Sequence, residues 1–452
     1  MPLPMIRGPV TGGSRGHVFG GSVRELAAYG YVEEEYFLEG EAKRFLVSKT
    51  PADGRFLSEK EPEPAPYKTR LVVRRPQDPA RFNGTVLVLW TNVTMGCEII
   101  DDLEGFTDGF ALLAVSAQGA GLEGFSGMPS GLKSWDSKRY GSLHLPGDAY
   151  SFDIFGQAAR AVGAGGARAG VDPLAGLDVR HRVALGASQS ASRLVSFIDA
   201  VQPIDPAFDG FVSVVDFGAY AIFDDRVHDE GGRVEYTPEG FAAAGIPLAR
   251  KRDDVDAKVL VVNSETEART WNAVEQPDTD SHRVWFVAGA AHGGVGEPRI
   301  RTQILERDGL PGLLVPHETP SLVLFPGVVE AAFHAMYQWL ETGVAPRPQP
   351  RFEFEAEGSH LLRDGDGIIR GGIRLPDVAV PRAVNVGEGP DMTGFAALSG
   401  ASTPFPPERI RALYPTDEAY VAEVQQVVAR LLADGVILQR TADRYLEQAR
   451  AC

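Results

Sequence analysis

The residue best placed to act as a nucleophile is a serine between a short apolar run and a helical pattern. Residues 180–194 read RHRVALGASQSASRL, which contains Gly-x-Ser-x-Ser with Ser188 at its centre. A strand that turns sharply into a helix exposes the Oγ of its pivot serine at the carboxyl edge of a sheet. The turn requires small neighbours, and Gly186 and Ser190 meet that requirement. The alternative interpretation of Ser188 is an ordinary N-cap serine.

A serine hydroxyl is a poor nucleophile near neutral pH and requires a base. The chain contains nine histidines, and His292 alone lies just past a strong apolar strand pattern within a loop of small residues, 288–294. Such a loop allows a histidine to reach across the edge of the sheet. Three others are placed within a helix or at the wrong end of a strand: His334, His181 and His282. We therefore predict that His292 is the base.

An imidazole base works best when a carboxylate fixes its tautomer and stabilises the imidazolium. The expected strand at residues 258–262 ends in Asn-Ser-Glu-Thr-Glu, which places Glu265 and Glu267 in one turn at the carboxyl edge. Glu267 is five residues beyond Val262, far enough to curl back towards His292. We prefer Glu267 as the acid, with Glu265 holding the loop, and Glu265 is the alternative acid.

A tetrahedral intermediate carries an oxyanion that needs at least two N–H donors. The backbone N–H of Gln189, the residue after the nucleophile, is the first expected donor. The second is expected from the loop 91–96, which follows an earlier strand. Within that loop the sequence does not distinguish Asn92 from Val93.

Composition and charge exclude several classes of protein. The chain has 452 residues, of which 44% are hydrophobic, so it can bury a large core. It contains no apolar run of the roughly 18 to 20 residues that a membrane helix needs, and its first residues do not resemble a secretory signal. A net charge of −17 argues against nucleic acid as a partner. Two cysteines form neither a disulfide framework nor a zinc pattern. We expect a cytoplasmic protein without a metal or organic cofactor.

Strand and helix patterns alternate along most of the chain, which predicts a doubly wound α/β fold with a mostly parallel sheet. An antiparallel edge strand is expected at residues 31–38, where apolar and polar residues alternate more. The expected buried strands are residues 69–73, 85–90, 111–115, 182–185, 211–215, 258–262 and 283–287. The expected helices are residues 148–162, 190–201, 327–340 and 417–433.

Two regions interrupt this alternation. Residues 217–257 separate two strands, and we expect an insertion that covers the site as a lid, with a long surface excursion as the alternative. Residues 346–452 form a C-terminal extension, which includes a Gly/Pro-rich piece at 387–407. The predicted organisation is thus a hydrolase-like core over residues 1–345 and an extension, 346–452, packed on it.

Several segments resemble a bacterial family of α/β-hydrolase-domain proteins, largely uncharacterised serine hydrolases and esterases. The likeness spans about residues 25–450, and its motifs are RFNGTV (81–86), WTNVT (90–94), WDSKRYGSL (135–143), PGDAYSFDIF (146–155), GASQS (186–190), SETE (264–267) and GGIRLP (371–376). The resemblance implies an α/β-hydrolase fold, Ser188 as nucleophile, His292 as base and the SETE turn as the source of the acid. The chain order Ser, Glu, His is that of α/β-hydrolases.

The sequence therefore predicts a serine hydrolase, specifically a carboxylic-ester hydrolase that forms an acyl-enzyme on Ser188 and acts on a small-molecule ester. The alternatives are an acyltransferase with the same triad and a non-catalytic hydrolase-like binding protein. A Gly-x-Gly-x-x-Gly match at 119–124 is rejected as a dinucleotide site, because a loop and not a helix is expected after it. The sequence leaves the acyl and alcohol preference, and the oligomeric state, open.

Overall fold

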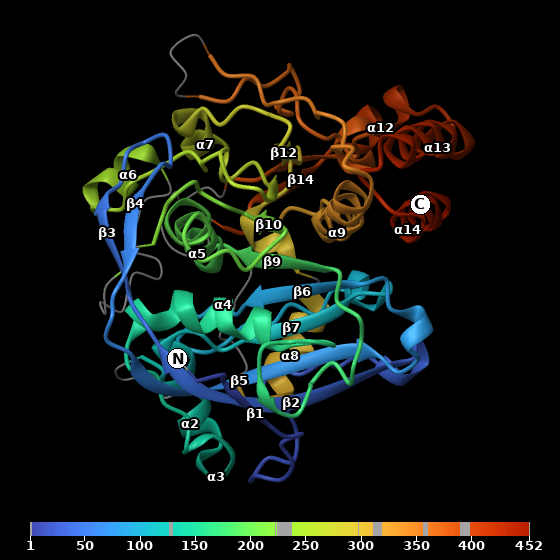
Figure 1. Cartoon of the computed structure of the whole chain (residues 1–452). Coiled ribbons are helices and arrows are strands. Elements are labelled where there is room, and N and C mark those ends of the chain that lie inside the picture. The colour runs from blue at the N-terminus through green and yellow to red at the C-terminus, as the bar shows by residue number, and fades with distance from the viewer. Residues whose placement is uncertain are drawn as a thin grey trace.

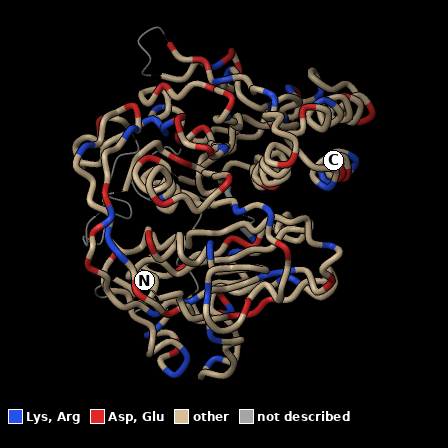
Figure 2. The backbone as a smooth tube through the Cα atoms, in the orientation of Figure 1, with Lys and Arg blue, Asp and Glu red and all other residues tan. Residues whose placement is uncertain are grey.

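A single large twisted sheet forms the centre of the molecule (Figure 1). In this computed structural model the described residues are 2–125, 130–221, 223, 237–296, 298–310, 319–355, 360–388 and 398–451. Within them the sheet has ten strands in the order β12-β11-β10-β9-β6-β7-β5-β2-β1-β8. Acidic and basic residues are both spread over the whole backbone in Figure 2.

The strands of this sheet are β1 (Met5–Arg7), β2 (Tyr31–Ala42), β5 (Ala65–Pro76), β6 (Thr85–Trp90), β7 (Ala111–Val115), β8 (Ala169–Gly170), β9 (His181–Ala187), β10 (Gly210–Val214), β11 (Lys258–Asn263) and β12 (His282–Phe286). Two short hairpins add β3 (Phe45–Lys49) with β4 (Leu57–Lys60), and β13 (Ala383–Val386) with β14 (Ala401–Pro404).

The α-helices are α1 (Gly119–Glu123), α2 (Leu132–Trp135), α3 (Ser137–Tyr140), α4 (Ser151–Ala161), α5 (Gln189–Ser196), α6 (Pro238–Ala243), α7 (Ala268–Val274), α8 (Pro298–Arg307), α9 (Phe325–Thr342), α10 (Pro376–Ala379), α12 (Pro407–Leu413), α13 (Asp417–Asp434) and α14 (Gln439–Arg450). A π-helical turn, η5 (Phe197–Val201), continues α5. Short 3₁₀ helices include η3 (Glu104–Thr107), η4 (Asp148–Tyr150) and η6 (His292–Val295).

The mostly parallel α/β sheet predicted from the sequence is confirmed. Strands β7, β6, β9, β10, β11 and β12 run parallel to one another. Their residues are almost entirely buried, because helices cover both faces, and runs of Val and Leu satisfy that environment. Helix α5 packs on β9 and β10, and α9 lies on the opposite side of these strands, where it contacts β10 and β11 (Figure 1).

Two details of the expected sheet are wrong. Strand β2 is antiparallel, as predicted, but it is not an edge strand, because β1 and β8 lie beyond it. Residues 69–73 lie in β5, which is antiparallel to both β2 and β7 and is not part of the parallel set. Its core run of Leu71 to Val73 is buried on both faces, so it shows no polar alternation that could have distinguished the two arrangements.

The insertion expected at 217–257 is described at 217–221, 223 and 237–257, where it contains α6. The rest of the predicted lid lies outside the described residues. A buried ion pair joins the two ends of this segment, since Lys251 Nζ lies 2.7 Å from Asp216 Oδ2 and neither side chain is exposed. This ion pair holds the beginning of the insertion to a point near its end. The role of the insertion as a lid stays a prediction.

A hairpin from the other half of the chain supports the same segment. Strands β3 and β4 lie beside α6 in Figure 1, although they come from the connection between β2 and β5. The Arg250 N–H donates to the Ala52 carbonyl at 2.9 Å, and the rings of Phe56 and Tyr220 meet edge to face at 4.9 Å. The insertion is therefore held from its outer side as well as at its base.

The C-terminal residues pack against the core and reach the carboxyl edge of the sheet. Ile373 pairs with Val287, the residue after β12, in a parallel bridge. The predicted helix at 417–433 is confirmed as α13, whose buried face includes Val424 and Val428 and belongs to the main hydrophobic core. The boundary predicted at residue 345 stays a prediction.

Candidate active site

Ser188 lies at a sharp turn between β9 and α5, as the sequence pattern indicates. Its backbone has φ 58° and ψ −119°, a region that costs a non-glycine residue energy and that recurs at functional sites. A Cβ on Gly186 would approach Ser190 O to 2.8 Å and the Leu194 side chain to 3.0 Å, so only glycine fits there. The sequence thus supplies a glycine where the strand and the helix come closest.

The serine at position 190 strengthens the turn in a way that a second glycine cannot. Its buried Oγ accepts a hydrogen bond from the Ala187 N–H at 2.9 Å and lies 2.9 Å from the Ala187 carbonyl, to which it donates. The Ser188 N–H donates to Val214 O at 3.0 Å, which anchors the pivot to β10. The strained conformation of Ser188 is therefore fixed from both sides.

The structure brings His292 to Ser188 across the edge of the sheet. Nε2 of His292 lies 2.8 Å from the Oγ of Ser188. His292 begins the 3₁₀ turn η6, six residues after β12 ends at Phe286, and it is only 5% exposed. Its own N–H donates to Thr266 Oγ1 at 3.1 Å, which joins the histidine loop to the turn after β11.

Glu267 lies on the other side of the same imidazole. Its Oε1 is 2.6 Å from His292 Nδ1, and its side chain is fully buried. Oε2 accepts hydrogen bonds from the Ser264 N–H at 2.8 Å and the Ser264 hydroxyl at 2.7 Å. Three polar groups therefore surround this carboxylate and hold it in one orientation.

Glu265 points away from His292. One of its oxygens pairs with Arg363 from the C-terminal extension, and the other accepts from the Gly289 N–H at 3.2 Å. Burial raises the pKa of Glu265 above its ordinary value, and the Arg363 guanidinium opposes that rise. The geometry separates the two carboxylates of the turn, and it places Glu267 alone beside the imidazole.

The expected oxyanion donors lie in two segments, the start of α5 and the loop that follows β6. Gln189 is the first residue of α5, so its N–H has no partner within the helix. The Val93 N–H faces the same region and donates to Oε1 of the Gln189 side chain at 3.4 Å. The side chain of Asn92 is used elsewhere, because its Nδ2 donates to Ala187 O at 2.9 Å and its Oδ1 accepts from Thr94 N at 2.9 Å. The choice between the backbone N–H groups of Asn92 and Val93 stays a prediction.

An apolar cluster that sequence reasoning missed lies against the histidine. The ring of Phe217 stacks on the ring of His292, with centroids 5.1 Å apart and planes inclined by 19°. Phe217 also packs with Phe241 from the insertion and with Leu398 from the C-terminal extension. The sequence signal that could have found Phe217 was its position, three residues after the end of β10 at the carboxyl edge of the sheet.

The remaining sequence candidates lie elsewhere. His181 pairs with Glu341 at 2.8 Å and His334 with Asp108 at 2.9 Å, while His282 is buried at the start of β12. The glycine motif at 119–124 itself forms α1, which has only five residues, and most of the loop expected after the motif lies outside the described residues. Asp148 Oδ1 accepts from the Gly119 N–H at 2.8 Å, so a carboxylate already occupies the position that a phosphate would need.

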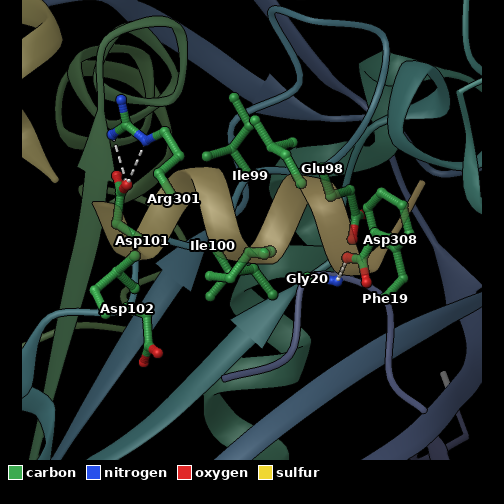
Figure 3. A pocket seen from close by; sticks show the side chains of 12 residues that line it. Phe19, Gly20, Glu98, Ile99, Ile100, Asp101, Asp102, Arg301 and Asp308 are labelled. Atoms are coloured by element: carbon green, nitrogen blue, oxygen red, sulfur yellow. Dashed lines mark hydrogen bonds and ion pairs between the residues drawn. The ribbon is translucent and has the colours of Figure 1, made fainter. Parts of the chain in front are cut away.

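A pocket behind the loop that follows β6 is distinct from this site. Figure 3 shows it between α8 and residues 98–102, with Arg301 paired to Asp101 and the Gly20 N–H donating to Asp308. It has room for about one water molecule, and neither Ser188 nor His292 lines it. Among the described residues no cluster of His, Cys, Asp and Glu could hold a metal ion.

The sequence matches the alpha/beta hydrolase domain family over residues 6–447. The chain belongs to this family. The resemblance seen in the sequence is therefore confirmed, together with the α/β-hydrolase fold. No curated protein sequence matches the chain. In the part of the chain that the structure describes, no helix has the length and apolar character to span a membrane.

Solved structures of hydrolases are also similar to this α/β hydrolase. One is the esterase Est22, at 12% identity and a TM-score of 0.34, over 62% of this chain and 79% of that one. Another is a ferulic acid esterase from Streptomyces cinnamoneus, at 14% identity and a TM-score of 0.36, over 72% of this chain and 96% of that one. Likenesses this distant say nothing about the substrate.

Proposed function

We propose that this α/β hydrolase is a serine hydrolase that cleaves carboxylic esters of small molecules. The observation that carries the proposal is the continuous chain Ser188 Oγ, His292 Nε2, His292 Nδ1 and Glu267 Oε1, with separations of 2.8 and 2.6 Å. These are hydrogen-bond distances, and the three groups are those that an acyl-transfer triad requires. Membership of the family supports hydrolysis as the class of reaction.

In the proposed first half-reaction Ser188 Oγ attacks the acyl carbon and His292 Nε2 takes the hydroxyl proton. The carbonyl π electrons move onto oxygen, and the N–H groups of Gln189 and Val93 stabilise the resulting oxyanion. When the intermediate collapses, the ester C–O bond breaks and the leaving oxygen takes the proton from His292. An alcohol leaves, and the acyl group remains as an ester on Ser188.

The second half-reaction repeats these steps with water. A water molecule transfers a proton to His292 as its oxygen bonds to the acyl carbon. The second tetrahedral intermediate expels Ser188 Oγ, which recovers its proton from His292, and the carboxylic acid leaves. Glu267 accepts the Nδ1–H bond throughout, so that Nε2 is free to receive a proton. No step draws on a metal or an organic cofactor.

Hydrolysis of a chain-length series of p-nitrophenyl esters tests the proposal. The wild-type protein is expected to release p-nitrophenolate, and Ser188→Ala is expected to lower kcat/KM by about 10⁴-fold or more. A matched control is Ser192→Ala, because Ser192 lies one turn further along α5 and takes no part in the proposed triad. If Ser188→Ala kept most of the activity, the assignment of the nucleophile would be wrong.

A further inference from the structure

The side chain of Gln189 lies where the substrate oxygen is expected to bind. Its Oε1 accepts a hydrogen bond from the Val93 N–H, with N and O 3.4 Å apart. Val93 N–H is also the second oxyanion donor in the proposed reaction. In the described structure, therefore, an amide carbonyl oxygen from the protein itself already takes one of the two donors.

Two further hydrogen bonds hold this carboxamide in place from behind. Nε2 of Gln189 donates to Gln118 Oε1 at 3.1 Å. The same oxygen accepts from Trp90 Nε1 at 3.0 Å, and both Trp90 and Gln118 are buried. Because Trp90 ends β6 and Gln118 follows β7, the orientation of Gln189 is set by the rigid sheet, and its amide oxygen is directed to Val93.

We propose that the Gln189 carboxamide is a resident occupant of the oxyanion hole, which the reacting acyl oxygen displaces from Val93. The inference rests on the proposed function, and it assigns to the Gln189 side chain a role separate from that of its backbone N–H. The hydrogen bond from Gln189 Nε2 to Gln118 Oε1 can persist during the exchange. The Gln189 side chain therefore rotates about this bond and does not have to leave the site.

The bond lengths explain why the exchange favours the transition state. A 3.4 Å N···O separation exceeds the usual 2.7 to 3.2 Å range, so the contact is weak and readily broken. A neutral ester carbonyl is an acceptor of the same kind as an amide carbonyl, so the substrate gains little by displacing it. An oxyanion accepts much more strongly. The occupant therefore weakens binding of the substrate carbonyl more than binding of the transition state, and displacing it from Val93 costs the free enzyme one weak hydrogen bond.

Two substitutions of Gln189 by side chains of similar size test this role, and they are expected to change the reaction rate in opposite directions. Gln189→Met removes the competing oxygen, and Gln189→Glu replaces it with a charged one. The measurement is the second-order rate constant for phosphorylation of Ser188 by diethyl p-nitrophenyl phosphate, whose phosphoryl oxygen enters the same hole. Gln189→Met is expected to react about threefold faster than wild type, because a weak hydrogen bond is lost. Gln189→Glu is expected to react at least about 30-fold slower.

The matched control is Gln426→Glu on the exposed side of α13, which adds the same charge away from the site. A general structural defect is expected to slow both Gln189 variants, whereas displacement of an occupant predicts a gain in Gln189→Met and a loss in Gln189→Glu. A loss of tenfold or more in a folded Gln189→Met protein, or an unchanged rate in Gln189→Glu, would overturn the proposal while leaving the triad intact. If wild type itself were not phosphorylated on Ser188, the proposed function would fail and this inference with it.

Discussion

Nδ1 of His292 lies 2.6 Å from Oε1 of Glu267, the residue immediately before helix α7. The second oxygen of Glu267 is held by the N–H and hydroxyl groups of Ser264, so the carboxylate cannot rotate away from the ring. Glu265, two residues earlier, is equally buried but pairs with Arg363. Two carboxylates in one turn thus have different partners and, we expect, different roles.

Glu267→Gln is expected to lower kcat by about 10²- to 10⁴-fold, because the neutral amide no longer stabilises the imidazolium or selects the tautomer. Glu265→Gln is the matched comparison, since it removes the same charge from the same turn. It is expected to weaken stability through the loss of the Arg363 pair and to leave kcat within about threefold of wild type. Steady-state kinetics and urea unfolding of both variants check this. The opposite ranking of the two kcat values would transfer the acid role to Glu265.

Phe217 is expected to assist the protonated form of His292. Its ring is nearly parallel to the imidazole at a centroid distance of 5.1 Å, and an aromatic face attracts a cation. Phe217→Leu keeps an apolar side chain but removes this attraction, so kcat is expected to fall by about 3- to 10-fold. Phe241→Leu, in the same cluster, is the control and is expected to change kcat less. Equal losses in the two variants would show that only packing matters.

His282 predicts a dependence of stability on pH that is independent of the active site. Burial lowers its pKa from the ordinary 6.5 to about 3, so it stays neutral in the folded protein while the unfolded chain takes up a proton below pH 6.5. Its contribution to stability is complete above pH 6.5 and is lost as the pH falls towards 3. Between pH 7.5 and 5.5 the loss amounts to about 1 kcal/mol.

His282→Leu removes this ionisation and is the variant that checks it. The free energy of unfolding in urea is measured for both proteins at pH 7.5 and 5.5. The wild-type value is expected to fall by about 1 kcal/mol more than the variant value over this interval. Identical pH dependence in the two proteins would mean that His282 keeps an ordinary pKa in the folded state.

The parts of the fold that depend on local pattern were predictable from the sequence. Strands β6 and β7 begin and end at the residues that the apolar runs indicate, and α13 and α9 match their amphipathic spacing to within a few residues. The direction of β5 was not predictable, because a strand buried on both faces looks alike in parallel and antiparallel sheets.

Among the residues proposed for the site, too, some could be predicted from local sequence and others depend on tertiary structure. Ser188 and His292 lie next to strands whose ends the sequence marks, so their meeting at one edge could be expected. The choice between Glu265 and Glu267 depended on Arg363, which is about a hundred residues away and on the C-terminal extension. The side-chain contact between Gln189 and Val93 likewise depends on tertiary structure, and no spacing in the sequence indicates it.

The assignment of Ser188 as the nucleophile is tested by labelling the intact protein with a fluorophosphonate, followed by mass spectrometry of its peptides. One adduct is expected, on the hydroxyl of Ser188; it is absent from Ser188→Ala and forms far more slowly in His292→Ala, because that imidazole activates the oxygen. A folded wild-type protein that takes up no label, or that is labelled on a different serine, would contradict this assignment.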